Sequence, residues 1–208
     1  MMRFVLLISL IVFGNGCRIS ANFHEVEKGK FYRSATLTAE ELTLAIEKIG
    51  IKTIINLRGS AVGKKWYEDE VRVANEHNVK LISIGMSASR TPSREKLLAI
   101  VDAYRDEQYP ILIHCKAGAD RTGLATAIYL FDEGVPKRKA KKALAAKYYH
   151  FKKFTPAMDY FFEQYLGSDW ALLAYFPCED NYKYFDHKDC PAIADEPIDL
   201  APSEDEDT

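Results

Sequence analysis

A cysteine and an arginine stand six residues apart in the segment HCKAGADRTG, residues 114–123. The segment follows the apolar run PILI, which predicts a buried strand, and it precedes an apolar helical stripe that begins near Arg121. A loop of small residues between a strand and a helix can curl so that its backbone N–H groups point inward, and the helix N-terminus adds partial positive charge. We therefore predict a cradle for a tetrahedral dianion.

Two side chains of this segment are suited to phosphoryl transfer. The dipoles that bind an anion also favour the thiolate form of a cysteine at the base of such a loop, and Cys115 holds that position. Arg121 offers a planar guanidinium that binds two phosphate oxygens at once. A sulfur nucleophile beside a bound phosphoryl group predicts transfer of that group to sulfur.

The segment resembles the signature loop, His-Cys-x5-Arg-Ser/Thr, of the cysteine-dependent protein tyrosine and dual-specificity phosphatases. The match includes Gly118 at the turn, Thr122 after the arginine, and Gly123. FYRSA, IKTIINLR and the helical C-terminal half follow the order of the compact dual-specificity type, so the resemblance spans residues 31–166. It implies an α/β domain in which helices flank a central, mostly parallel sheet.

The resemblance also implies roles for individual residues. Cys115 would be the nucleophile that forms a phosphocysteine, and Arg121 would hold the phosphoryl group. His114 would orient the loop and help to keep the thiolate, and Thr122 would assist hydrolysis of the intermediate. The equatorial phosphate oxygens would be bound by the backbone amides of Lys116, Ala117, Gly118, Ala119, Asp120 and Arg121. No metal or other cofactor is required.

The general acid departs from the family pattern. These enzymes take an aspartate from the loop after the preceding strand, to protonate the leaving oxygen. Here that loop is IGMSASRTPS, residues 84–93, which has no acid, and Asp102 is expected on a helix surface. Asp120 precedes the arginine, as in the myotubularin and Sac types of lipid phosphatase, where that aspartate is thought to act as the acid. Two alternatives stay open: Asp120 is a structural carboxylate paired with Arg58 or Arg33, or the substrate is an acyl phosphate or pyrophosphate that needs no acid.

Several features bear on the substrate. Lys116 follows the cysteine as in the tensin-type phosphoinositide phosphatases, although Ala119 stands where those enzymes have a second lysine. The segment KRKAKKALAAKYYHFKK, residues 137–153, is strongly basic; it is either a solvated helix face or added charge at the rim of the site. These features favour a phosphorylated anionic substrate such as an inositol phosphate or phosphoinositide over a phosphoprotein. Enzymes of fungi and plants that act on inositol pyrophosphates are similar at the level of the fold. No nucleic-acid motif is present.

Other protein classes fit the segment less well. A non-catalytic phosphate-binding module usually lacks the cysteine or the arginine, and both are present here. Rhodanese loops typically lack the C-x5-R-Thr-Gly run, and low-molecular-weight arsenate reductases place their cysteine near the N-terminus.

Alternating elements surround the motif. Strands are predicted at residues 51–57, 79–86 and 110–114, and helices at residues 64–78, from Pro92, from Arg121, along the basic segment and from Thr155–Pro156. Thr38 and Glu41 form a capping box for a further helix that Gly50 ends. In the last helix Met158, Phe161, Phe162 and Tyr165 are expected to face the core. Strands that alternate with helices predict a largely parallel sheet.

The N-terminus is typical of an export signal. Arg3 precedes the apolar run FVLLISLIVF, and Gly14 and Gly16 have the small-x-small spacing that a signal peptidase requires. Residues 1–16 are therefore a predicted signal peptide. Cys17 resembles the lipid-acceptor cysteine of bacterial lipoproteins, although Gly14 replaces the usual leucine. We expect export, either to the bacterial periplasm or to a membrane through lipidated Cys17.

The remaining chain divides into two parts. Residues 22–170 form the predicted phosphatase domain, and residues 171–208 a C-terminal extension with an acidic, disordered tail, IADEPIDLAPSEDEDT. Cys178 and Cys190 either form a disulfide in an oxidising compartment or remain two unpaired thiols. The chain of 208 residues is 48% hydrophobic with a net charge of −2, which argues against wholesale disorder and leaves the oligomeric state open.

Overall fold

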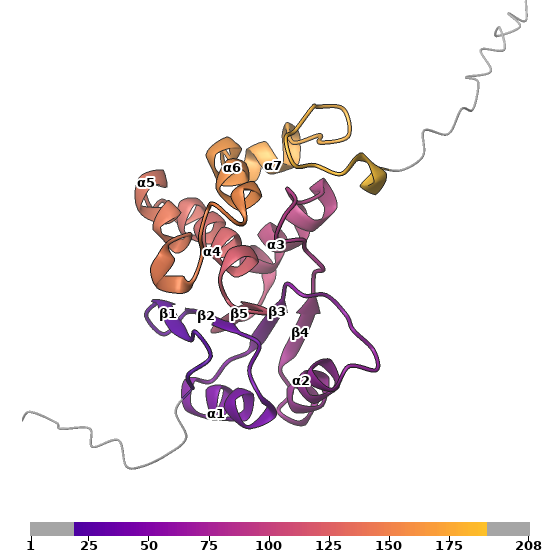
Figure 1. The fold of residues 1–208 in the computed structure, drawn as a ribbon. Helices are drawn as coiled ribbons and strands as arrows, with labels where there is room; N and C mark the ends of the chain where they lie inside the picture. Colours follow the sequence, from indigo (N-terminus) through magenta and orange to yellow (C-terminus); the bar gives the residue numbers. More distant parts are fainter. Residues whose placement is uncertain (1–18, 191–208) are drawn as a thin grey trace, which may run out of the picture.

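A five-stranded sheet forms the centre of the computed structural model, which describes residues 19–190 (Figure 1). The strand order is β1-β2-β5-β3-β4, with β1 antiparallel to β2 and the other neighbours parallel. The strands are β1 (His24–Glu27), β2 (Phe31–Ala35), β3 (Thr53–Asn56), β4 (Lys80–Ser83) and β5 (Ile111–Cys115). The predicted α/β class with a mostly parallel sheet is confirmed.

Helices cover both faces of the sheet. In Figure 1, α1 (Ala39–Ile49) and α2 (Lys65–Glu76) lie on one face, and the other helices lie on the opposite face. Those other helices are α3 (Arg94–Asp106), α4 (Asp120–Asp132), α5 (Lys137–Ala140), α6 (Pro156–Gln164) and α7 (Ser168–Leu173). Because both faces are covered, the three inner strands are buried along almost their whole length rather than at alternate residues.

The core has two layers, one on each side of the sheet. Ile54 and Leu112 pack with the buried side chains of α1 and α2, whereas Ile55 and Ile113 pack with those of α3, α4 and α6. The larger layer includes the four side chains predicted to face the core from α6, all 0% exposed: Met158, Phe161, Phe162 and Tyr165. Because successive side chains of a strand point to opposite faces of the sheet, neighbouring residues of β3 and β5 enter different core layers.

Two helix starts show how far local signals hold. Thr38 and Glu41 form the predicted capping box, and Gly50 ends α1 at a φ of 80°. Pro92 was predicted to lie in the first turn of α3, but it lies before the helix. Ser93 caps α3 instead, by accepting from the Lys96 N–H. The Pro92 carbonyl accepts instead from the hydroxyl of Tyr175.

The basic segment is not the continuous helix that its composition predicts. It contains only α5, a 3-10 turn at Lys141–Ala143 and a second at Ala146–Tyr148. Ala143 and Leu144 pack on α4 so closely that a Cβ on Gly123 would lie 2.9 Å from Leu144 Cδ2. Contacts made across the fold therefore override the helical preference of this segment.

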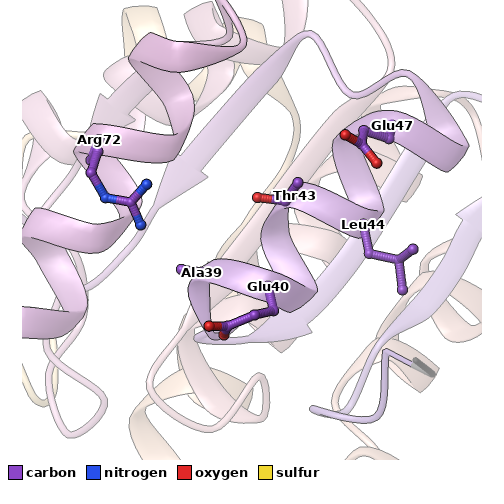
Figure 2. A pocket seen from close by; sticks show the side chains of 6 residues that line it. All are labelled: Ala39, Glu40, Thr43, Leu44, Glu47 and Arg72. Carbon is purple, nitrogen blue, oxygen red and sulfur yellow. The ribbon is translucent and has the colours of Figure 1, made fainter. Parts of the chain in front are cut away.

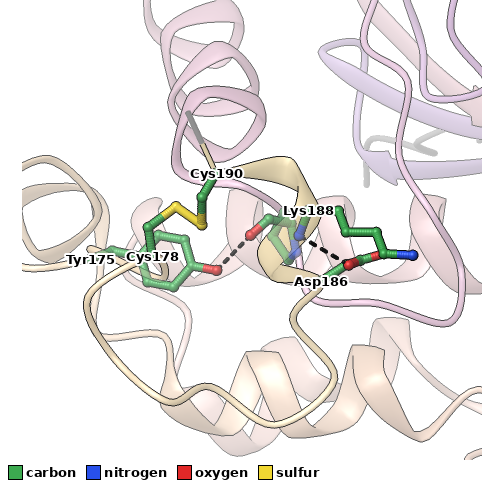
Figure 3. Close-up of a disulfide and its surroundings, with 6 residues drawn as sticks. Tyr175, Cys178, Asp186, Lys188 and Cys190 are labelled. Atoms are coloured by element: carbon green, nitrogen blue, oxygen red, sulfur yellow. Dashed lines mark hydrogen bonds between the residues drawn. A yellow bond between two sulfur atoms is a disulfide. The ribbon is translucent and has the colours of Figure 1, made fainter. Parts of the chain in front are cut away.

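The C-terminal segment packs against the domain. The predicted boundary at residue 170 falls within α7, and Tyr175 beyond it is 0% exposed. Cys178 and Cys190 form a disulfide, and Asp186 caps the turn between them by accepting from the Lys188 N–H (Figure 3).

Several predictions lie outside the described residues. They concern the signal peptide at 1–16, the acceptor Cys17 and the acidic tail at 193–208. Between residues 19 and 190, no helix is long and apolar enough to cross a membrane.

Candidate active site

The predicted cradle lies between the central strand β5 and helix α4. β5 ends at Cys115, which is buried at 2% exposure, and α4 begins at Asp120. Lys116 and Ala117 are exposed at the rim, whereas the next two residues are buried. The cysteine thus lies at the base of a short loop that opens to solvent at one end.

Gly118 allows this loop to pack on the end of β2. Its φ is 66°, and a Cβ at this position would lie 2.6 Å from backbone atoms of Ser34 and Ala35. Any other residue would combine a left-handed backbone with a collision against another strand. The glycine of the motif is therefore required by the fold of the loop.

Arg33 of β2 holds the loop from beneath. Its guanidinium, 0% exposed, donates to the carbonyls of Gly118 at 2.7 Å and Ala143 at 2.9 Å, and it lies 4.0 Å from the ring centroid of Tyr148. Burial lowers the pKa of Arg33 to about 10, so it remains charged at neutral pH. From the sequence, Arg33 is predicted only as one possible partner of Asp120.

Arg121 spans the mouth of the site. Its half-buried guanidinium donates through Nη1 to the carbonyls of Leu57 at 3.1 Å and Met86 at 3.2 Å, which follow β3 and β4. None of the described carboxylates lies within ion-pair distance of it, and its buried Nε has no hydrogen-bond partner among the described residues. The charge of Arg121 is therefore available to an anion in the cradle.

His114 belongs to a buried polar network behind the loop. Its Nε2 lies 2.5 Å from Glu70 Oε1, and Asn56 donates to the other oxygen of Glu70 at 2.8 Å. The backbone N–H of Arg58 donates to Asn56, which ties the loop after β3 to the same network. Among the described residues no hydrogen bond joins His114 to Cys115, so the structure places His114 where it can orient the strand end.

A second contact fixes the start of the cradle. Thr36 donates to the Cys115 carbonyl at 3.2 Å and accepts from Arg58 at 3.0 Å. The guanidinium of Arg58 lies 3.3 Å from the ring centroid of Trp66. Thr122 is fully buried, and its hydroxyl has no partner among the described residues.

One alternative predicted that Asp120 pairs with Arg58 or Arg33, and the structure shows neither pair. Oδ1 of Asp120 accepts from the Thr155 hydroxyl at 2.6 Å and lies 2.8 Å from His150 Nδ1. The two arginines do not reach it because one is bound beneath the loop and the other is stacked on an aromatic ring. Burial raises the pKa of Asp120, but hydrogen bonds from His150 and Thr155 outweigh it and hold this pKa below its ordinary value.

His150 connects this aspartate to a second one. It is 3% exposed, and its Nε2 lies 2.7 Å from Oδ2 of Asp159 on α6. Burial lowers the pKa of His150, but hydrogen bonds with Asp120 and Asp159 outweigh it and hold the pKa above the ordinary value. The one signal in the sequence was an acid at Asp159 within the apolar face of α6; nothing marked His150 within the basic segment.

The loop after β4 contributes no acid. Thr91 donates its N–H to the carbonyl of Tyr184 at 3.2 Å, and Arg90 lies 2.5 Å from the Asp186 carboxylate. Asp102 is exposed on α3, as predicted. The carboxylate that reaches this loop comes from the C-terminal segment and is neutralised there.

A groove elsewhere on the surface lacks the groups that this chemistry needs. It has a volume of about 380 Å³ and lies between α1 and α2, with Arg72 facing Glu40 and Glu47 across it (Figure 2). Its lining contains no cysteine, histidine or aromatic residue, and α1 and α2 cover the face of the sheet opposite α4. We therefore assign the candidate site to the loop after β5.

The structure thus brings together a buried cysteine at the base of the loop and an arginine in the first turn of α4, as the sequence predicted. The chain matches the family model "DSP-PTPase phosphatase fused to NAD+ Kinase" over residues 17–158. The chain belongs to this family of phosphatases of the tyrosine and dual-specificity class.

Solved structures of phosphatases share the fold. TpbA of P. aeruginosa is 20% identical with a TM-score of 0.55, covering 73% of this chain and 89% of that one. The catalytic core of the PP-IP phosphatase SIW14 of S. cerevisiae is 22% identical with a TM-score of 0.59, covering 74% and 90%. Tk-PTP in its active form is 16% identical with a TM-score of 0.51, covering 69% and 98%.

Proposed function

We propose that the chain hydrolyses phosphate monoesters through a phosphocysteine intermediate on Cys115. The supporting observation is that this buried thiol lies at the base of a loop closed by an arginine with no carboxylate partner among the described residues. The sulfur attacks phosphorus, the bond to the leaving oxygen breaks, and that oxygen takes a proton. Water then cleaves the P–S bond, which regenerates the thiolate and releases inorganic phosphate.

The loop would bind the phosphoryl group through its backbone. The amides of residues 116–121 are proposed to hold the equatorial oxygens, together with the guanidinium of Arg121. For this, Arg121 exchanges one or both of the carbonyls of Leu57 and Met86 for phosphate oxygens. The buried hydroxyl of Thr122 is proposed to assist hydrolysis of the intermediate, and His114 to orient the strand end.

Asp120 is the proposed general acid. Its side chain is 24% exposed at the start of α4, directly beside Arg121, so it lies at the rim of the cradle. The loop after β4 has no acidic residue to take this role. An aspartate that protonates the leaving oxygen matters most for esters whose alcohol is a poor leaving group.

The proposed substrate is a phosphorylated polyanion. Lys116 is exposed on the loop, and Lys142, Lys147, Lys152 and Lys153 are exposed on the segment that lies beside it. This charge favours inositol phosphates, their pyrophosphates or phosphoinositides over phosphoproteins. SIW14 is described as a PP-IP phosphatase, whereas a TpbA variant was solved in complex with pTyr, so both classes belong in the test.

The test is phosphate release by residues 19–190, with Cys115→Ser as the matched variant. The panel would contain inositol phosphates and pyrophosphates, phosphoinositides in vesicles, and phosphopeptides. We expect release from at least one inositol-based class, loss of it in Cys115→Ser, and a phosphorylated Cys115 peptide after acid quench during turnover. Release that persists in Cys115→Ser would contradict the mechanism, and preference for phosphopeptides would contradict the substrate class.

We also propose that the protein is exported, either to the periplasm or to a membrane through lipidated Cys17. The Cys178–Cys190 disulfide supports this location, since disulfides persist mainly in oxidising compartments. Fractionation of cells producing the full chain tests it, with Cys17→Ser beside the wild type. A protein that stays in the cytosol contradicts export, and equal membrane recovery of the two proteins contradicts lipidation.

A further inference from the structure

Three side chains from three elements form a continuous chain that ends at the candidate acid. Asp159 comes from α6, His150 from the irregular segment before it, and Asp120 from the start of α4. His150 Nε2 lies 2.7 Å from Asp159, and its Nδ1 lies 2.8 Å from Asp120. The side chains of Asp159 and His150 are buried, at 6% and 1% exposure, whereas that of Asp120 is 24% exposed.

The two oxygens of Asp120 have different surroundings. Oδ1 accepts both inward contacts, from Thr155 and His150. Oδ2 has no hydrogen-bond partner among the described residues. One oxygen of this carboxylate is thus bound to the histidine, while the other is free to meet a leaving group at the rim.

A carboxylate in these surroundings does not by itself hold a proton at neutral pH. The contacts from His150 and Thr155, and the nearby charge of Arg121, all favour its ionised form. The histidine between the two carboxylates is the group that retains a proton there, because both of its ring nitrogens face negative charge.

We propose that His150, held by Asp159, supplies the proton that Asp120 delivers to the leaving oxygen. The inference rests on the proposed function. In the first step the proton on His150 Nδ1 passes to Oδ1 of Asp120, and the neutral carboxyl group turns so that this O–H protonates the departing alkoxide, which leaves Asp120 ionised and His150 neutral. In the second step the water that attacks phosphorus gives its proton to Asp120, and His150 is protonated again. Neither His150 nor Asp159 touches the substrate, so both are positioning residues that act through Asp120.

The alternative is a purely structural role. His150 also attaches the segment around Tyr148 to the loop, and Asn22 does the same by donating to the carbonyls of Ala117 and Tyr148. A structural role predicts equal losses on all substrates and no change in the pH profile. A proton-supplying role predicts losses that grow as the leaving group becomes poorer.

The experiment compares His150→Gln and Asp159→Asn with the wild type on an activated aryl phosphate and on phenyl phosphate. Glutamine can still donate a hydrogen bond to Asp120, but it has no titratable proton to transfer. We expect a fall in kcat of about 10- to 100-fold on phenyl phosphate in His150→Gln and less than about 3-fold on the activated ester. The alkaline limb of the pH profile on phenyl phosphate should move to lower pH, further in His150→Gln than in Asp159→Asn.

Two controls separate this inference from its alternatives. His24→Gln removes a histidine that contacts Asn22 and Tyr148 but not Asp120, and it should leave both the ratio between substrates and the pH profile unchanged. Cys115→Ser tests the proposed function independently, since it should remove turnover of both esters. Turnover that depends on Cys115, but with equal losses on both esters in His150→Gln or an unmoved pH profile, would overturn the role of His150 and leave the phosphatase mechanism standing.

Discussion

The loop after β5 and the loop after β4 lie at the same edge of the sheet, on either side of the end of β3, yet they are held in different ways. The first is fixed from within the domain, by Arg33 beneath it and by Thr155 and His150 at its end. The second is fixed by the C-terminal segment, through Tyr184 and Asp186. Groups able to react are concentrated in the first loop, whereas the second has no acid and provides a carbonyl for Arg121.

The comparison indicates that the loop after β5 carries the reactive groups, whereas the loop after β4 has a supporting role. In the family pattern the loop after β4 supplies the acid. Here that loop has no acid, and it is contacted by a C-terminal segment that a disulfide closes into a turn. Asp120, the proposed acid, instead lies at the end of the loop that begins at Cys115, the proposed nucleophile.

The largest difference in activity is expected between variants of the two aspartates that reach these loops, Asp120 and Asp186. Asp120→Asn should lower kcat on phenyl phosphate by about 10²–10⁴-fold, because asparagine cannot protonate the leaving oxygen. Asp186→Asn should change it by less than about 3-fold, since that carboxylate pairs with Arg90 and caps a turn of the C-terminal segment, away from the loop after β5. Steady-state rates on both proteins check this. A larger loss in Asp186→Asn would instead indicate that the acid comes from the C-terminal segment beside the loop after β4.

The two loops should also differ in their tolerance of an added methyl group. Gly118→Ala should lower the free energy of unfolding by about 2–4 kcal/mol, because it combines a left-handed backbone with a contact at 2.6 Å. At Gly85 an added Cβ meets nothing nearer than 3.7 Å, so Gly85→Ala should cost less than about 1 kcal/mol. Urea unfolding measures both, and similar losses would contradict the packing of Gly118 on β2.

Opening the disulfide should weaken support without affecting the chemistry. The paired Cys178→Ser and Cys190→Ser replacement removes a crosslink over 12 residues, which should cost about 2–3 kcal/mol of stability. We expect kcat on the activated ester to change by less than about 3-fold, because no hydrogen bond or ion pair between described residues joins the loop after β5 to this segment. A loss of activity larger than the loss of folded protein would show that the loop after β4 takes part in the reaction.

The smallest expected effect is a pH dependence of stability that comes from His150, which contacts the end of the loop after β5. The pKa of His150 is raised on folding, so its contribution to stability is fully present below the ordinary histidine pKa and is lost as pH rises through the folded value. The difference in Tm between wild type and His150→Gln should therefore shrink from about pH 5.5 to about pH 8.5. His24→Gln provides the reference, because burial and the charges of Arg33 and Lys147 lower its pKa in the folded state. A difference that grows with pH would mean that His150 is neutral in the native protein.

Local patterns predicted much of the fold and the centre of the site. Thr38, Glu41 and Gly50 delimit α1 as expected, because a cap depends on residues a few positions apart. Glu70 was missed, although its position three residues before Val73 places an acid on the buried face of α2, where it needs a partner. The basic segment was predicted wrongly because composition records its helical preference but not its contacts with α4.

What the sequence by itself determined is the set of groups that must lie together because the chain joins them: Cys115, the loop amides and Arg121. Their spacing is covalent, and a strand followed by a helix leaves that loop few conformations. The partners of Asp120 were decided only by the tertiary structure. His150 is 30 residues from Asp120, and Asp159 lies beyond it on another helix. His150 contacts Asp120, and Asp159 contacts His150, only because α6 and α4 pack together.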